Sequence, residues 1–212
     1  MKVYRHVDKM AAISRQRRWT VSDKDPTHRF YDFHARPDLI PTVLEDFSPF
    51  GDQPAVCEFY SLLANMNGPQ SQFETNDSAF KGPHPNTSQG ASPLARQISG
   101  RLMFYFREVP LNTSREYVEW LEEGVHFYLE QLTPEFADGV VGTSVMKMHM
   151  PELGTEKEPA DGFELCLHFW SWGESDDQAW DNLHIVMRNL QQALAALSQD
   201  AEEQRYLNPA GA

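Results

Sequence analysis

Long apolar runs and cysteines are the first things that this sequence lacks. No segment approaches the roughly 18 uninterrupted apolar residues of a membrane span, so we expect no membrane association. The 212 residues include only two cysteines, Cys57 and Cys166, which form neither a CxxC pair nor a metal-ligand spacing. A disulfide framework is therefore not expected, and a reducing compartment is the default. The basic segment 1–19 has no apolar core, which argues against a secretory signal and favours a cytoplasmic location.

Sequence motifs of the common enzyme classes are also absent. The chain contains no GxGxxG, no P-loop, no GxSxG, no HExxH and no zinc-finger spacing. An enzyme whose residues are scattered along the chain would escape such a search. We therefore leave catalysis open, favour a protein that is not an enzyme, and predict no cofactor and no metal.

Positive charge is scarce and unevenly placed. The chain carries 18 basic and 31 acidic side chains, a net charge of −13. Residues 1–24 hold seven basic side chains against two acidic ones, so this segment is +5 and the remaining 188 residues carry −18. An acidic body repels phosphate backbones, which disfavours direct binding to nucleic acid. Its negative charge serves either solubility or the steering of a basic partner protein.

Composition predicts a folded domain with a basic lead and a polar tail. Hydrophobic residues make up 41% and charged residues 23%, both near the averages of globular proteins. We expect a basic N-terminal lead over 1–24, a single α+β domain over 25–198 and a polar, frayed C-terminal tail over 199–212. Inside the domain, residues 67–97 are rich in Gly, Pro, Ser and Asn and show no periodicity, which predicts a long irregular loop.

The second half of the chain has the clearest pattern. Strands are expected over 100–109, 140–150 and 163–172, and helices over 114–132 and from Ser175 to 198. Thr113 and Glu116 have the spacing of a capping box, and Ser175 is suited to an N-cap. The order β-α-β-β-α predicts a ferredoxin-like core in residues 98–198, a mostly antiparallel sheet with two helices packed on one face. The missing strand would come from 54–66, whose type is ambiguous, or from the N-terminus around Val3 and Tyr4.

The predicted 140–172 hairpin carries the first candidate site. Antiparallel pairing would place Lys147 and His149 opposite Cys166 and Glu164, with His168 beside them. Such a patch could support nucleophilic or general acid–base chemistry. The same alternation is also typical of the solvent face of any half-covered sheet, and a one-residue slip would change every pairing.

Acidic and aromatic side chains form the second candidate site, a docking edge for a partner. Carboxylates near the start of the last helix are also favoured by the helix dipole, and tryptophans at 170, 172 and 180 are either core residues or interface hot spots. The candidate partner-binding residues are Glu152, Glu156, Glu158, Asp161, Trp172, Glu174, Asp176, Asp177 and Asp181.

One further cluster resembles a metal site in its residue types alone. His28, Asp32 and His34 would share a face if the segment were extended. His28 and His34 would then lie roughly 20 Å apart, too far to share one ion. Two close ligands make a weak site, so no metal is predicted here.

These observations favour a protein-binding, inhibitory function. The expectation is an immunity- or antitoxin-like bacterial protein whose acidic surface neutralises a basic toxin or nuclease. One alternative is a small-molecule enzyme or ligand-binding domain, with a dimer as one oligomeric state, that uses the polar face of the 140–172 hairpin. Another is a phage or secretion-system assembly protein whose 67–97 loop orders on assembly.

Overall fold

A mixed β-sheet forms the centre of the molecule. The computed structural model describes residues 1–5, 15–16, 31–87, 90–150 and 160–207. The strands follow the order β1-β5-β6-β4-β3, and β2 also pairs with β5. The β3–β4, β4–β6 and β5–β6 pairs are antiparallel, whereas β1 and β2 run parallel to β5. The strand bounds are β1 Lys2–Arg5, β2 Arg15–Gln16, β3 Phe73–Pro85, β4 Arg96–Phe106, β5 Gly139–Met150 and β6 Ala160–Gly173.

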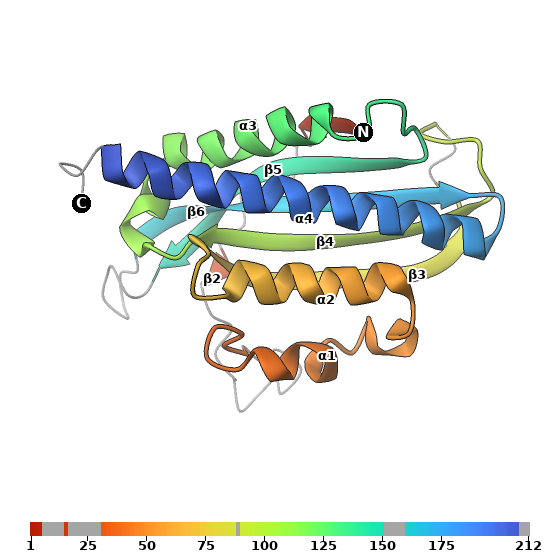
Figure 1. Ribbon diagram of the computed structural model, residues 1–212, viewed down its shortest axis with the longest axis horizontal. Coiled ribbons are helices and arrows are strands. Elements are labelled where there is room, and N and C mark those ends of the chain that lie inside the picture. Colours follow the sequence, from red (N-terminus) through yellow and green to blue (C-terminus); the bar gives the residue numbers. More distant parts are fainter. Residues whose placement is uncertain (6–14, 17–30, 88–89, 151–159, 208–212) are drawn as a thin grey trace.

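Three helices cover one face of this sheet (Figure 1). They are α2 (Pro54–Asn67), α3 (Arg115–Gln131) and α4 (Asp176–Leu207), with α4 in the middle and in contact with both others. The fold is therefore α+β, with one more helix on this face than the sequence predicted. The short helices are η1 (Pro37–Leu39), α1 (Ile40–Val43), η2 (Ser48–Phe50) and η3 (Val109–Thr113).

The main core lies between the sheet and the three helices. Phe169 of β6 is fully buried there, with its ring centroid 6.0 Å from that of Phe59 on α2. Gly100 of β4 makes room for this ring, since a Cβ atom at position 100 would lie 2.4 Å from a ring carbon of Phe169. Real Cβ atoms do not approach other atoms so closely, so this glycine is required by the packing of its neighbour.

The predicted irregular loop over 67–97 is wrong. Residues 73–85 form β3, which pairs antiparallel with β4, and only residues 86–95 connect the two strands. Register shifts between Thr75 and Asp77 and between Lys81 and His84 interrupt the pairing. Bulges of this kind, together with prolines on an edge strand, remove the period of two by which a strand is recognised. The N-terminus around Val3 and Tyr4 does contribute a strand, β1, and β3 is a further strand of the sheet, whereas the ambiguous 54–66 segment is helix α2.

Other predicted elements are confirmed with shifted ends. The three predicted strands are β4, β5 and β6, the helix over 114–132 is α3, and Val3 and Tyr4 lie in β1. Ser175 caps α4, because its Oγ accepts a hydrogen bond from the Gln178 N–H at 3.2 Å. The capping box is wrong: α3 follows Ser114, and the Thr113 hydroxyl donates to the Pro110 carbonyl at 2.8 Å. Helix α4 continues through residues 199–207 of the predicted tail.

Two buried asparagines close gaps in the backbone hydrogen bonding. The Asn112 carbonyl accepts from the Phe106 N–H at 2.8 Å, and its amide donates to the Phe106 carbonyl at 2.8 Å and to the Val109 carbonyl at 3.2 Å. Asn67, the last residue of α2, acts in a similar way, because its side-chain carbonyl accepts from the Thr75 N–H at 3.1 Å. Buried backbone groups need hydrogen-bond partners. These side chains supply the hydrogen bonds that a neighbouring strand or helical turn would otherwise make.

Candidate functional site

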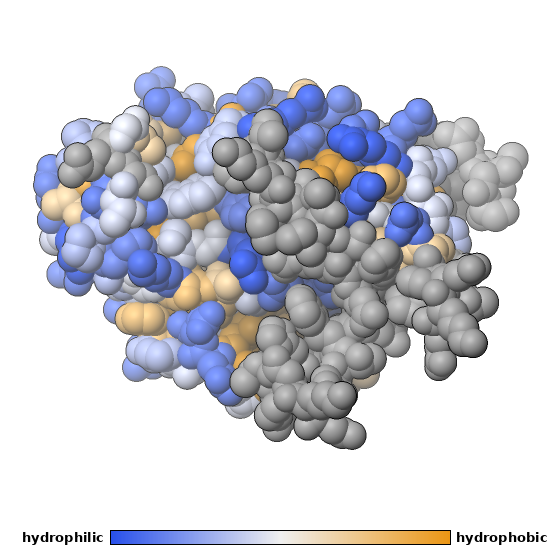
Figure 2. Space-filling model, turned by 180° about the vertical axis from the view of Figure 1, so that it is seen from behind, coloured by the Kyte–Doolittle hydropathy of each residue, from blue (hydrophilic) through white to orange (hydrophobic). Residues whose placement is uncertain are grey.

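The face of the sheet that none of the described helices covers holds the candidate site; we call it the helix-free face, and Figure 2 shows the molecule from this side. Successive side chains of a strand point to opposite faces. Odd-numbered residues of β6, such as Leu167 and Phe169, belong to the core under the helices. The even-numbered residues Cys166, His168 and Trp170 therefore line the opposite face.

Part of this second face is a buried polar cluster. Glu164 is fully buried, and its carboxylate accepts a hydrogen bond from the Asn76 amide at 2.9 Å. The Cys166 sulfur lies 3.3 Å from Nε2 of His168, within hydrogen-bonding distance. Cys166 is itself buried and packs with Met103 and Met146. A buried thiol among methionines is typical of an inert structural cysteine rather than a nucleophile.

The predicted grouping of Lys147 and His149 with Cys166 and Glu164 is wrong. In the observed register Lys147 pairs with Phe163 and His149 with Asp161, whereas Cys166 pairs with Ser144 and Glu164 with Met146. Directly paired residues share a face, so the exposed Lys147 lies on the helix side of the sheet. The register differs from the expected one by three residues, and a shift by any odd number exchanges the faces.

A row of three stacked rings lies on the helix-free face. The Tyr4 and Trp170 centroids are 6.0 Å apart at an interplanar angle of 24°, and those of His168 and Trp170 are 5.7 Å apart at 23°. We call Tyr4, Trp170 and His168 the aromatic row. Gly142 of β5 lies beneath it, because a Cβ atom there would lie 3.0 Å from the Tyr4 ring and 3.2 Å from the Trp170 ring. Strands β1 and β6, which lie on either side of β5, thus bring their rings together across a position without a side chain.

A cavity of about 330 Å³ adjoins the aromatic row. We call it the aromatic pocket, since Tyr4, Trp170 and Trp172 line it together with Lys2 and Val140. Tyr4 is 40% exposed. The indole N–H of Trp172 is buried and has no hydrogen-bond partner in the described part of the chain. Chemically the pocket offers flat apolar walls and the ammonium group of Lys2.

The predicted acidic edge does not form one surface. Asp161 and Glu174 lie at opposite ends of β6, about 43 Å apart at ~3.3 Å per residue. Asp176 is neutralised by an ion pair with Arg96, whereas Asp177 and Asp181 are exposed and have no ion pair with a described residue. Three of the predicted residues, Glu152, Glu156 and Glu158, lie outside the described residues.

Of the predicted weak metal cluster His28, Asp32 and His34, only the last two residues lie within the described part of the chain. Asp32 and His34 lie in a turn, where the Asp32 carboxylate accepts from the Ala35 N–H at 3.0 Å. Nδ1 of His34 lies 2.8 Å from the carbonyl of Asn67. His28 lies outside the described residues. Among the described residues, no three His, Cys, Asp or Glu side chains are grouped to hold an ion.

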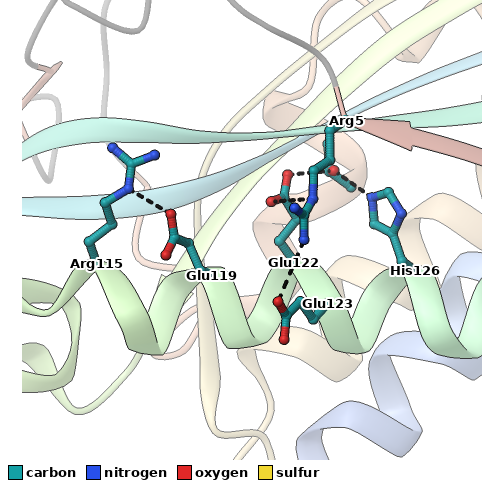
Figure 3. Close-up of polar contacts among 7 residues, drawn as sticks. Arg5, Arg115, Glu119, Glu122, Glu123 and His126 are labelled. Atoms are coloured by element: carbon teal, nitrogen blue, oxygen red, sulfur yellow. Dashed lines mark hydrogen bonds and ion pairs between the residues drawn. The ribbon is translucent and has the colours of Figure 1, made fainter.

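Strand β1, which carries Tyr4 and Lys2, is tied to α3 by a polar network (Figure 3). Nε of Arg5 lies 3.1 Å from the buried Glu122 carboxylate, and its terminal nitrogen lies 3.6 Å from Glu123. The Thr143 hydroxyl donates to Glu122 at 2.7 Å and lies 2.8 Å from Nε2 of His126. A hydroxyl has one proton, so neutral His126 donates from Nε2. We call these residues the Arg5 network.

This network was not predicted from the sequence. Glu122 and His126 are four residues apart on α3 and therefore share one side of the helix. The residues that precede them, Leu121 and Val125, belong to the core, so Glu122 and His126 lie at the edge of the apolar stripe of α3. A polar pair at that boundary is the signal that could have indicated a buried contact. Its partner Arg5 was not identifiable without the pairing of β1 and β5.

The Arg5 network makes stability depend on pH. Burial lowers the pKa of His126 below its ordinary value of 6.5; the Glu122 and Glu130 carboxylates oppose this shift, and Arg5 adds to it. As the pH falls below 6.5, the unfolded chain takes up this proton before the folded chain does. The contribution is therefore fully present above pH 6.5 and is lost as the pH falls towards the folded pKa.

We expect a His126→Gln variant to lose less stability than the wild type between pH 7.5 and pH 5.5. Glutamine keeps an N–H donor for Thr143 but has no titratable group. Urea unfolding at the two pH values measures the difference. Identical losses in the two proteins would show that the imidazole is not the group responsible.

No protein-family model, curated protein or solved structure matches this chain. The helices of the described segments include none with the length and apolarity to cross a bilayer. Function therefore has to be argued from the helix-free face and its pocket.

Proposed function

We propose that this chain is a binding protein that docks onto a partner protein through the aromatic row and the aromatic pocket. The observation that carries the proposal is the partly exposed Tyr4–Trp170 stack beside a cavity. Tyrosine and tryptophan dominate the hot spots of protein interfaces, because they bury a large area at little cost in conformational entropy. Stacking holds both rings in place before binding, which lowers that cost further.

The charge of the chain supports a basic partner. A net charge of −13 attracts positively charged proteins over distances limited by the salt concentration. Exposed carboxylates such as Asp177 and Asp181 contribute to this field from the start of α4. The specific form that we propose is an immunity- or antitoxin-like inhibitor of a basic toxin or nuclease.

Binding is favoured over catalysis by the residues of the helix-free face. The thiol nearest to an imidazole, that of Cys166, is buried, and Lys147 lies on the other side of the sheet. A small ligand in the aromatic pocket is the second candidate, supported by its volume of about 330 Å³. The assembly-protein alternative is less supported, because residues 73–85 of the predicted loop form strand β3.

The topology also supports a proposal about the core. We propose that β4, α3, β5, β6 and α4 make up the split β-α-β part of a ferredoxin-like arrangement. Strand β6 lies between β4 and β5 and is antiparallel to both, as that arrangement requires. Strand β3 would then take the place of the fourth strand, although it precedes β4 in the chain.

Substitutions in the aromatic row test the binding function. We expect Trp170→Ala and Tyr4→Ala each to weaken binding of a basic partner, such as the product of a neighbouring gene, by about 30-fold or more, corresponding to ~2 kcal/mol. Tyr117→Ala is the matched control, because Tyr117 is 49% exposed on α3, away from the site. Calorimetric titration of each purified variant with the partner measures the effect.

Association and dissociation rates distinguish the two contributions that we propose, which are electrostatic attraction of a basic partner and docking on the aromatic row. An Asp177→Asn, Asp181→Asn variant is expected to associate more slowly at low salt while its dissociation rate stays unchanged. Binding that is equally tight in the wild type and in the Trp170→Ala and Tyr4→Ala variants would place the interface elsewhere. Turnover of a small molecule by a chain that binds no basic protein would replace the proposal with an enzymatic one.

A further inference from the structure

Sulfur-containing side chains gather on the helix-free face, outside the aromatic pocket. Met146, Met148 and Met150 occupy every second position of β5 and therefore share one face of the strand. All three are buried. Met103 of β4 lies directly opposite Cys166 of β6 in the antiparallel register, and it is buried as well. Four of the eight methionines of the chain thus lie on the face that carries the buried thiol.

Two of these methionines pack against the thiol. Met103, Met146 and Cys166 form one cluster of buried side chains. His168 follows Cys166 by two positions on β6, and its Nε2 lies 3.3 Å from the Cys166 sulfur. Ligands bound to one zinc ion through sulfur and nitrogen, at about 2.3 and 2.0 Å, lie roughly 3.5 Å apart. The thiol and the imidazole therefore lie close to the separation of two ligands of a single metal ion.

We propose that Cys166, His168, Met103 and Met146, which we call the sulfur cluster, bind one copper(I) ion. Soft thiolate and thioether ligands select copper(I), and imidazole suits copper as well. Methionine has three rotatable side-chain bonds, so its sulfur can turn towards an ion without a change in the backbone. On binding, the Cys166 thiol releases its proton to solvent, and the thiolate neutralises the charge of the ion.

Zinc is disfavoured at the sulfur cluster by the types of ligand present. Zinc is held by thiolate, imidazole and carboxylate groups, and thioethers are absent from its usual ligands. The buried carboxylate on this face, that of Glu164, accepts a hydrogen bond from the Asn76 amide at 2.9 Å. No three His, Cys, Asp or Glu side chains are grouped to hold an ion in the described part of the chain. Zinc would therefore find two good ligands here, whereas copper(I) finds four.

The surroundings of the sulfur cluster suit an ion better than an organic substrate. The thiol and the two thioethers are buried, whereas His168 is partly exposed and gives a small ion a path from the surface. A buried, protonated thiol is a poor nucleophile, but a soft ion replaces its proton. An apolar shell also limits the access of water and oxidants to the metal. The site is independent of the proposed partner site, with which it shares His168.

Competition titration tests the choice of metal. The chromogenic chelator bicinchoninate holds copper(I) under anaerobic, reducing conditions, and the full chain withdraws it. A Cys57→Ala background is used throughout, because Cys57 is an exposed thiol that would bind copper by itself. We expect one copper(I) ion per chain, bound about 100-fold or more tightly than zinc(II). Silver(I), a soft ion without redox chemistry, should shift the methyl NMR signals of Met103 and Met146 but not that of Met187 in the main core.

Variants distinguish the sulfur cluster from general binding to sulfur. Met103→Leu and Met146→Leu nearly keep the side-chain volume and remove one ligand each, so we expect binding of copper(I) to weaken about tenfold. His168→Phe keeps an aromatic ring and should weaken binding by a similar factor, and Cys166→Ala should abolish it. Met187→Leu is the matched control and should leave the affinity unchanged.

Circular dichroism identifies the variants that are folded, and the two methionine variants suffice if Cys166→Ala is not. Absence of copper(I) binding in the Cys57→Ala chain would overturn the proposal. So would tighter binding of zinc(II), or an affinity for copper(I) that is the same in the Met103→Leu, Met146→Leu and Met187→Leu variants.

Discussion

Replacing Phe169 by alanine is expected to lower the free energy of unfolding by about 3–5 kcal/mol. The ring is fully buried in the central strand β6 and lies against α2 through Phe59 and against the backbone of Gly100. Its removal loses the transfer free energy of the ring and leaves a cavity that rigid strands on both sides of β6 cannot close. Urea or thermal unfolding of the purified variant measures the change.

Phe127→Ala is the matched control for this prediction. The Phe127 side chain is 59% exposed on α3, so its loss should change stability by no more than about 0.5 kcal/mol. If Phe169→Ala lowered the free energy of unfolding by less than about 1 kcal/mol, the helices would not pack tightly on this part of the sheet.

Replacing Asn112 by alanine is expected to cost about 3 kcal/mol. Its side chain makes three hydrogen bonds to backbone groups around the end of β4, and the residue is fully buried. Alanine removes these bonds and leaves the N–H and carbonyl of Phe106 without the partners that they have here. Unfolding in urea gives the stability, and hydrogen exchange of the Phe106 amide should accelerate selectively.

The adjacent Thr113→Ala variant is the control for the asparagine. Thr113 is exposed and donates one hydrogen bond within η3, so its loss should cost about 0.5 kcal/mol or less. If the two variants were equally stable, the end of β4 would be held by other contacts. The capping-box interpretation of the sequence makes the reverse prediction, since it gives Thr113 the larger role.

Periodicity was sufficient to predict the elements that are covered on one face. Residues 114–132 show a helical stripe, and β5 and β6 are long enough for their apolar residues to stand out. Strand β3 escaped detection because its hydrophobic residues Phe73 and Phe80 are separated by polar residues and bulges. Loop-like composition and edge-strand composition are similar, so composition alone predicted the wrong structure.

The candidate site was less predictable than the fold. Trp170 and Trp172 were noted as hot-spot candidates, but Tyr4 is more than 160 residues away in sequence. Tyr4 and Trp170 meet only because β1 pairs with β5 and because position 142 is glycine. Register also decided which polar residues share a face, and no property of a single strand specifies register. The residue pattern of a single segment therefore cannot predict a site whose residues come from several strands.

The polar contacts of β1 have a consequence for how binding strength could be adjusted. This strand has four residues; Tyr4 lines the aromatic pocket, and the adjacent Arg5 reaches α3 on the other side of the sheet. A change at Glu122 would therefore alter how firmly one wall of the pocket is held without altering any surface that a partner touches. Affinity and selectivity can then evolve separately, the first through the anchoring of the strand and the second through the rings that it presents.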